Sequence, residues 1–266
     1  HSTTNLLIEE EDNDCLDKRL KCDDRLFPEF PLYIEGMRKP GGRGVLHFIG
    51  TCLLPFGFYH LYYESQGYLP ALISGFFYLF TNLWCYGVSG LFHTLTWSKN
   101  TEILLQKLDH CGIALLSCGT FVPVSVLLLE QPWGFLLTFA TSSTCAWACY
   151  NIFSGSPSVF RQAIVPACFF PFLPLAYMRM TSLEYFCCIS TIVCQILGIS
   201  VFVNHRPDPL PNCIGYHEIF HLFVTLAGVF VYICNWSVIH RMSNPTGDYS
   251  SDIYYLYFDT KLFENF

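Results

Sequence analysis

The chain has 266 residues, of which 52% are hydrophobic and only 13% are charged, and its formal net charge is -7. Soluble domains carry about 25% charged residues, so this composition excludes an ordinary water-soluble protein. The negative charge gathers near the two ends of the chain, and no basic patch suited to nucleic acid is present. We therefore expect an integral multi-pass membrane protein that does not bind nucleic acid.

Seven long windows contain no Asp, Glu, Lys or Arg: 44–63, 65–98, 110–129, 131–160, 162–178, 185–205 and 219–240. The hydrocarbon core of a bilayer is about 30 Å thick, and about 20 apolar residues of helix cross it. The windows therefore predict an all-α membrane protein, a bundle of seven transmembrane helices. We expect the spans at 45–63, 69–95, 110–129, 133–153, 162–178, 185–203 and 217–239, with long connections only at 96–109 and 204–216, and with the fifth span kinked by Pro166, Pro171 and Pro174.

Positive charge predicts the orientation of these spans, because cytoplasmic loops carry an excess of Lys and Arg. With the N-terminus inside, seven such residues lie on the inner side and three on the outer side. We therefore expect the N-terminus inside and the C-terminus outside. This divides the chain into a cytoplasmic flank (1–44), a seven-span domain (45–240) and a non-cytoplasmic tail (241–266).

Five polar residues mark the inner ends of three spans. Ser89 and His93 lie at the end of the second span, Asp109 opens the third, and His217 and His221 open the seventh. In the expected topology all five reach the inner face at similar depth. Ionisable groups inside a membrane are costly and are usually functional.

The spacing of these residues suits a metal ion. Ser89 and His93 are four residues apart, as are His217 and His221, so each pair shares one face of its helix. Three histidine nitrogens and a water molecule form a common catalytic zinc site, in which the pKa of the water falls to about 7. Asp109 would then hold that water or act as a general base, and Ser89 would bond to Asp109 or to a substrate carbonyl.

The remaining histidines have a simpler interpretation. His47, His60, His205 and His240 stand singly at span ends, where we expect interfacial polar residues. His110 directly follows Asp109 and points about 100° away on a helix, so we expect it to make loop or interface contacts.

Three segments carry a family resemblance: Ser89–His93 (SGLFH), Lys107–Ala114 (KLDHCGIA) and Gly215–Val224 (GYHEIFHLFV). In order and spacing they resemble the signature motifs of the PAQR/hemolysin-III family, over roughly residues 45–240. That family includes the adiponectin and membrane progestin receptors and is related to the alkaline ceramidases. The sequence departs from it at Glu218, where family members carry a variable and often uncharged residue.

The resemblance implies a zinc ion (Zn2+) held by His93, His217 and His221, with Asp109 acting on the zinc-bound water and Ser89 nearby. It also implies an N-inside topology. Family members are receptors, and some hydrolyse ceramide to sphingosine and a fatty acid. We therefore expect a membrane receptor with an intramembrane zinc site near the cytoplasmic face that can hydrolyse a lipid amide such as ceramide. Its partner would be a membrane lipid, a steroid or lipid-like ligand, or an extracellular protein hormone; the oligomeric state and the membrane, plasma or Golgi/ER, stay open.

Two alternatives use the same ligands. In the first, the protein is a receptor without enzymatic activity and the zinc is structural. In the second, Glu218 completes an HExxH motif and the protein is an intramembrane metalloprotease. The third ligand of such a protease would be His240 or a residue of 244–248, but these lie about 30 Å of helix away from His217. A transporter or channel would need charges at mid-membrane or paired broken helices, and a rhodopsin-like receptor is disfavoured by the inside N-terminus.

Overall fold

The structure, a computed structural model, describes residues 42–155, 159–210 and 214–244, except for the side chains of residues 159–161. Within these ranges the fold is helical and has no β-strand, which confirms the all-α prediction for this part of the chain. The helices are α2 (Val45–Glu64), α3 (Leu69–Thr94), α4 (Lys99–Pro123), the π-helix η1 (Val124–Leu128), α5 (Trp133–Phe153), α6 (Val159–Ala167), the 3-10 helix η2 (Phe170–Phe172), α7 (Leu173–Tyr177), α8 (Ser182–Asn204) and α9 (Tyr216–Ser243).

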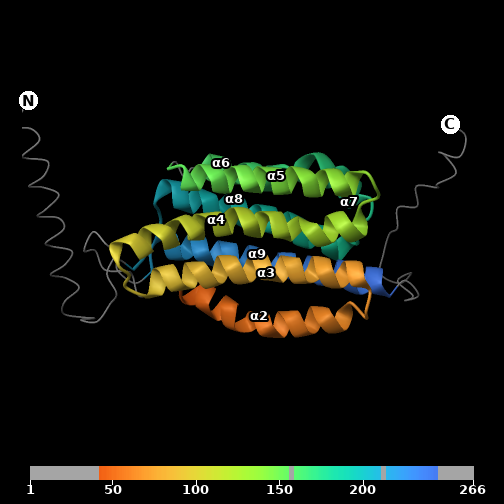
Figure 1. The fold of residues 1–266 in the computed structure, drawn as a ribbon, viewed down its shortest axis with the longest axis horizontal. Helices are drawn as coiled ribbons and strands as arrows, with labels where there is room; N and C mark the ends of the chain where they lie inside the picture. The colour runs from red at the N-terminus through yellow and green to blue at the C-terminus, as the bar shows by residue number, and fades with distance from the viewer. Residues whose placement is uncertain (1–41, 156–158, 211–213, 245–266) are drawn as a thin grey trace, which may run out of the picture.

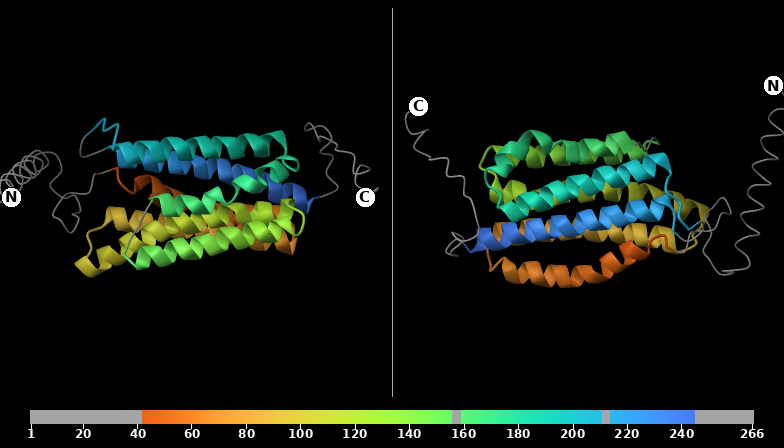
Figure 2. Two further views of the ribbon diagram at one scale, coloured as in Figure 1. Left: turned by 90° about the horizontal axis from the view of Figure 1, so that it is seen from above. Right: turned by 180° about the vertical axis from the view of Figure 1, so that it is seen from behind.

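The helices lie side by side along the long axis of the molecule and alternate in direction (Figures 1 and 2). Helix α3 packs against α2, α4 and α9, and α9 packs in turn against α8. Helix α5 covers α4 on the other side. Because α3 runs towards one end of the bundle while α4 and α9 start there, the last turn of α3 meets the first turns of the other two. Helix α2 begins at this same end, which we call the histidine end because it carries His93, His217 and His221.

In the described part of the chain, five helical segments are long and apolar enough to cross a membrane by length and composition: Val45–Glu64, Leu69–Thr94, Lys99–Leu128, Ser182–Asn204 and Tyr216–Ser243. Large apolar side chains also cover the outside of the bundle. Phe56 and Tyr59 on α2, for example, are each 72% exposed. Monomeric soluble proteins rarely expose large contiguous apolar surfaces. The structure thus agrees with an integral multi-pass membrane protein.

The fourth and fifth predicted spans take a different form. Helix α5 begins at Trp133 and ends at Phe153 as expected, but it is not among the five segments that reach the required hydropathy. The fifth region is broken into α6, η2 and α7, and Pro171 and Pro174 lie in the first turns of the latter two. Proline removes a backbone donor and clashes with the preceding turn, which accounts for the break. The count of seven spans stays a prediction, as does their orientation.

The prediction of a long connection at 96–109 was wrong. Helix α4 begins at Lys99, so the connection after α3 covers only residues 95–98. Charged residues mark where a helix leaves the hydrocarbon, but they do not prevent its backbone from being helical. Residues 99–109 contain no Gly or Pro that would interrupt a helix.

The packing of α3 against α4 depends on two small residues. A Cβ atom on Gly119 would lie 2.0 Å from Oγ1 of Thr81, and one on Gly112 would lie 3.1 Å from Cα of Cys85. No other residue type would allow α4 to approach α3 so closely at Gly119. This approach brings the start of α4 against the end of α3.

The main apolar core lies in the half of the bundle away from the histidine end. It joins the second half of α2, the first half of α3, η1 and the second half of α9, through Leu61, Tyr78, Leu79, Leu127 and Ile239 among others. The candidate site residues Ser89, His93, Asp109, His217 and His221 therefore lie at the other end of the bundle from the main apolar core.

Candidate metal centre

The site is assembled from helix ends. His93 lies in the last turn of α3, which stops at Thr94 where the chain becomes extended at Leu95. His217 and His221 lie in the first two turns of α9, and their four-residue spacing places them on one face of that helix. The antiparallel packing of α3 and α9 then brings the two faces together.

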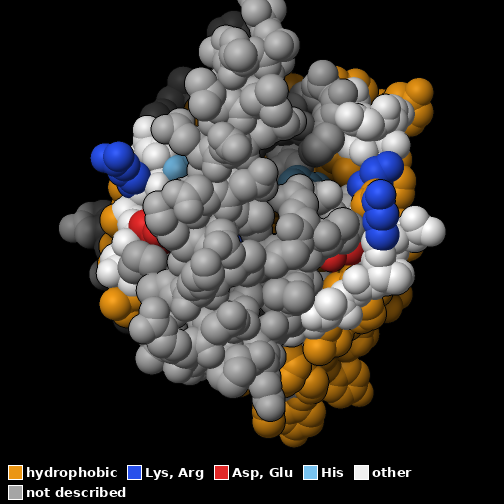
Figure 3. Space-filling model, turned by 90° about the vertical axis from the view of Figure 1, so that its left-hand side faces the viewer, with side chains coloured by type: hydrophobic (Ala, Val, Ile, Leu, Met, Phe, Trp, Pro, Cys, Tyr) orange, Lys and Arg blue, Asp and Glu red, His pale blue; other side chains and the backbone are white. Residues whose placement is uncertain are grey.

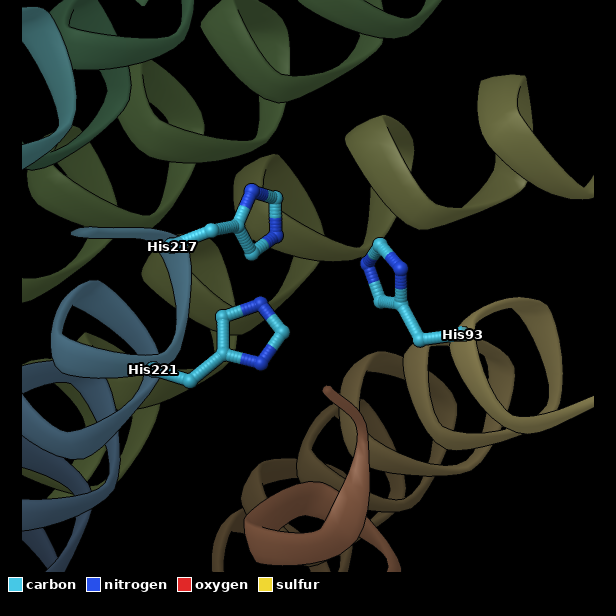
Figure 4. A group of neighbouring side chains, drawn as sticks. All are labelled: His93, His217 and His221. Atoms are coloured by element: carbon cyan, nitrogen blue, oxygen red, sulfur yellow. The ribbon is translucent and has the colours of Figure 1, made fainter. Parts of the chain in front are cut away.

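The three imidazole rings face one another (Figure 4). One ligand atom from each of His93, His217 and His221 can be chosen so that all three lie within 4.8 Å of one another. The ring centroids are 5.0 Å apart for His93 and His217, 5.3 Å for His93 and His221, and 4.6 Å for His217 and His221. The residues predicted to hold a metal therefore converge in space, although their role as ligands stays a prediction.

Asp109 and Ser89 border this cluster. Oδ2 of Asp109 lies 3.8 Å from Nε2 of His93, a separation longer than a direct hydrogen bond. Ser89 stands one turn before His93 on α3, is buried, and approaches the carboxyl group of Asp109. Both residues thus lie against the histidine cluster, on different helices, and their catalytic roles stay a prediction.

The residues present fit a zinc ion. His93 and His221 are buried and His217 is partly buried, so the cluster is shielded from bulk solvent. Nδ1 of His221 is buried and has no hydrogen-bond partner among the described residues. Buried polar atoms are normally satisfied, and an imidazole nitrogen without a protein partner is a typical metal ligand. Three nitrogen donors with a neighbouring carboxylate match the donor set of catalytic zinc sites.

Glu218, the acidic residue of the HExxH sequence, faces other partners. Its Oε1 atom accepts a hydrogen bond of 2.6 Å from Nε of Arg43, and its Oε2 atom accepts one of 2.7 Å from the backbone N–H of Gly215. The second bond caps the N-terminus of α9. Both carboxylate oxygens therefore accept hydrogen bonds that stabilise the start of α9.

His47 is the residue that the sequence analysis missed. It is only 4% exposed, so it packs inside the bundle, whereas we expected an interfacial polar residue without a part in the cluster. Its ring stacks on that of His221, with centroids 4.1 Å apart and planes inclined by 10°. The predicted topology could have indicated this position, because His47 lies in the first turn of the first predicted span, at the same predicted membrane face as His93 and His217.

The other histidines among the described residues lie apart from the cluster. His60 and His240 both pair with Glu64, where α2 ends and α9 approaches its own end, far from the histidine end. His205 is exposed in the loop before α9. Nδ1 of His110 lies 2.6 Å from the backbone oxygen of Gln106, within its own helix.

Figure 3 views the histidine end directly. Histidine, basic and acidic side chains are visible there, and hydrophobic side chains appear towards the periphery. This is the surface expected for the end of a bundle whose flanks are apolar and whose polar groups gather at helix termini.

One comparison with known proteins bears on this site. The family model described as "Haemolysin-III related" matches residues 36–232 of the chain, which is well over half of its 266 residues. The matched range contains Ser89, His93, Asp109, His217 and His221.

Proposed function

Because this chain belongs to the haemolysin-III-related family, which is the PAQR/hemolysin-III family, we propose that it is a membrane receptor with a zinc ion at its histidine cluster and the capacity to hydrolyse a lipid amide. The observation that carries this proposal is the convergence of His93, His217 and His221 within 4.8 Å, beside Asp109. The receptor role rests on the family alone.

The proposal assigns His93, His217 and His221 as the residues that would hold the metal. Zinc bound in this way polarises a carbonyl group and lowers the pKa of water, the chemistry that amide hydrolysis needs. The partial burial of the cluster supports this chemistry, because electrostatic interactions are stronger where water is excluded.

Asp109 and Ser89 would act on the reacting molecules. The Asp109 carboxylate, whose Oδ2 atom lies 3.8 Å from Nε2 of His93, would accept a proton from a water molecule within the site and return it to the amine that leaves the amide. Ser89, which is buried beside it, would hold that carboxylate in place or donate a hydrogen bond to the substrate carbonyl. Proton transfer by a positioned carboxylate contributes about 10²- to 10⁴-fold to a rate.

The expected substrate class is a membrane lipid with an amide bond, such as ceramide. The apolar exterior of the bundle supports a ligand that arrives through the bilayer, and a steroid or another lipid-like ligand fits the same argument. A protein hormone as partner rests on the family alone. The proposed topology has seven spans with the N-terminus inside, which puts the cluster near the cytoplasmic face of either the plasma membrane or a Golgi or ER membrane.

Two observations bear on the alternatives. Glu218 is engaged by Arg43 and by the start of α9, which disfavours a role as the general base of an HExxH protease. A receptor with purely structural zinc needs the same three histidines. The position of Asp109 against His93 favours hydrolysis over that alternative.

The proposal is tested by the metal content of the purified protein, measured by elemental mass spectrometry. We expect about one zinc per chain, lost in a His217→Ala/His221→Ala double variant. His205→Ala is the matched control, since His205 is an exposed histidine outside the cluster. A folded wild-type protein without metal, or a double variant that keeps its zinc, would overturn the proposal.

A further inference from the structure

His47 lies at the start of α2 and reaches the histidine cluster from a third helix, in addition to α3 and α9. Its side chain is 4% exposed. Its ring stacks on His221 of α9, with centroids 4.1 Å apart, and contacts the ring of Tyr86 on α3 at 4.9 Å. His47 is therefore packed between the two helices that carry His93, His217 and His221.

The ring nitrogens of His47 have no partner in the part of the chain that the structure describes. Both Nδ1 and Nε2 are buried, and neither makes a hydrogen bond to those residues. A buried polar group without a partner destabilises a protein by about 1–3 kcal/mol. Phe or Leu would fill this space without that cost. The nitrogens therefore indicate a polar partner outside the described residues, and a water molecule or a ligand bound beside the cluster would supply it.

The start of α2 is held against the cluster by its neighbours. Gly44 has a φ of +87°, and a Cβ atom there would lie 2.9 Å from Cγ2 of Thr94 and 3.1 Å from Cβ of His93. Arg43 forms its ion pair with Glu218 of α9. The first turn of α2 thus contacts the end of α3 and the start of α9, which fixes the ring of His47 over that of His221.

The stacking geometry separates His47 from the three proposed ligands. A metal ion lies about 2.0–2.1 Å from an imidazole nitrogen, in the direction of its lone pair and hence close to the plane of the ring. The planes of His47 and His221 are nearly parallel, and the rings are 4.1 Å apart. The nitrogens of His47 and His221 would therefore not bind the same ion. His47 also lies outside the group of three histidines whose ligand atoms converge.

We propose that His47 is a fourth histidine of this site, which holds the ring of His221 in its metal-binding orientation by stacking and binds an oxygen atom of a water molecule or ligand beside the metal through a ring nitrogen. This inference rests on the proposed metal site. It gives His47 two separable contributions, one from its aromatic face and one from its nitrogens.

Two substitutions separate these contributions. His47→Phe keeps an aromatic ring against His221 and removes both nitrogens, whereas His47→Ala removes the ring as well. Zinc affinity is measured by competition with a chromophoric chelator, and the site is then loaded with Co²⁺ so that its visible absorption reports the coordination geometry. Acetohydroxamate, whose oxygen atoms bind metals, is titrated into the Co²⁺-loaded protein as a probe of the hydrogen bond between His47 and a ligand beside the metal.

We expect His47→Ala to weaken zinc binding by about 10- to 100-fold and to change the Co²⁺ spectrum, as loss of a group that orients a ligand does. We expect His47→Phe to bind zinc within a few-fold of wild type but to bind acetohydroxamate about tenfold more weakly, because one hydrogen bond is lost. His205→Ala should match the wild type in all three measurements. If His47→Ala does not fold, the acetohydroxamate titration of His47→Phe decides the inference.

The outcomes also distinguish this inference from the proposal on which it rests. If wild-type protein binds zinc and the His47 variants match it in affinity, spectrum and acetohydroxamate binding, the role of His47 is overturned and the metal site stands. If the wild-type protein binds neither zinc nor Co²⁺, both proposals are overturned.

Discussion

The Nε atom of Arg43 lies 2.6 Å from Oε1 of Glu218, and this ion pair ties the turn before α2 to the first turn of α9. Glu218 is 5% exposed and also caps α9 through the backbone N–H of Gly215. The middle acidic residue of a literal HExxH sequence therefore has a structural role at a helix end. The same contact brings the start of α2, and with it His47, onto the histidine cluster.

This relationship predicts the effect of Glu218→Gln. Glutamine keeps an oxygen acceptor for Gly215 but removes the negative charge that Glu218 presents to Arg43. The variant should lose about 1–3 kcal/mol of stability while keeping its zinc and any amide hydrolysis. Thermal unfolding in detergent, zinc content and ceramide turnover are the measurements.

Arg43→Gln is the matched control for this variant, because it breaks the same ion pair from the other side. A double variant should be less destabilised than the sum of the two single variants. Loss of hydrolysis in Glu218→Gln with zinc retained would contradict the structural assignment and would revive the metalloprotease alternative.

Asp109→Asn separates the enzyme from the receptor with structural zinc. Asparagine has nearly the same shape as aspartate but cannot accept the proton of a water molecule at the site. We expect ceramide turnover to fall by about 10²- to 10⁴-fold, with zinc content and thermal stability close to wild type. Turnover is measured as released sphingosine.

Asp208→Asn is the control for this change, since it makes the same substitution at an exposed position in the loop before α9. It should leave turnover unchanged. Undiminished turnover in Asp109→Asn would exclude Asp109 as the base. A wild-type protein with bound zinc and no turnover of lipid amides would support the receptor in which zinc is structural.

The sequence predicted the convergence of the three histidines where the argument combined periodicity with topology. His217 and His221 share a helix face because they are four residues apart, and His93 meets them because α3 and α9 run in opposite directions. Each step follows from general geometry. The same reasoning could have found His47, but a lone histidine at a span end carries no spacing signal of its own.

Other features could not be derived from charge patterns. The start of α4 at Lys99 is set by backbone hydrogen bonding and not by where the charge-free window begins. The break at Pro171 was predicted as a kink, but the division into three short helices depends on packing. The partners of Glu218 depend on a contact between residues far apart in the chain, to which no local pattern points.

The close approach of α3 and α4 predicts the effect of Gly119→Ala. The added Cβ would lie 2.0 Å from Oγ1 of Thr81 and 2.8 Å from its Cβ, so one helix must move. Overpacking of this kind costs about 1–3 kcal/mol, and the shift would also displace Asp109 from His93. We expect a lower melting temperature together with weaker ceramide turnover.

Gly87→Ala is the control for this variant, because no described residue outside its own helix turn comes within 4 Å of a Cβ atom at Gly87 on α3. It should be neutral or slightly stabilising, since Ala favours helix more than Gly does. Thr81→Ala should partly rescue Gly119→Ala by removing the opposing hydroxyl. Equal melting temperatures for the two glycine variants would show that the helices are not packed as described.

Removal of the Glu184 side chain, at the end of the bundle opposite the histidines, should destabilise the protein. Its carboxylate is fully buried and accepts hydrogen bonds from Nη2 of Arg241 (3.0 Å), Oγ of Ser237 (2.9 Å) and the backbone N–H of Thr181 (2.8 Å). Glu184→Ala leaves the largely buried guanidinium of Arg241 without its counter-charge, which costs about 3–5 kcal/mol. Thermal unfolding should show this loss.

Glu130→Ala is the matched control for Glu184→Ala. Glu130 pairs with Arg179, but both side chains of that pair are at least half exposed, so its loss should cost no more than about 1 kcal/mol. In both variants the zinc content per folded chain should equal that of wild type, because the histidines lie at the other end. Similar destabilisation by the two substitutions would contradict the burial of Glu184.

The orientation in the membrane decides which compartment the histidine end faces. Seven basic residues on one side of the predicted spans against three on the other favour a cytoplasmic histidine end. In cells whose plasma membrane alone is permeabilised with digitonin, a tag fused before residue 1 should be stained by antibody. A tag fused after residue 266 should be stained either in intact cells, if the protein is at the plasma membrane, or only after full permeabilisation, if it is in the Golgi or ER. The opposite pattern would reverse the topology and would place the proposed zinc site on the extracellular or lumenal side, where the supply of substrate would differ.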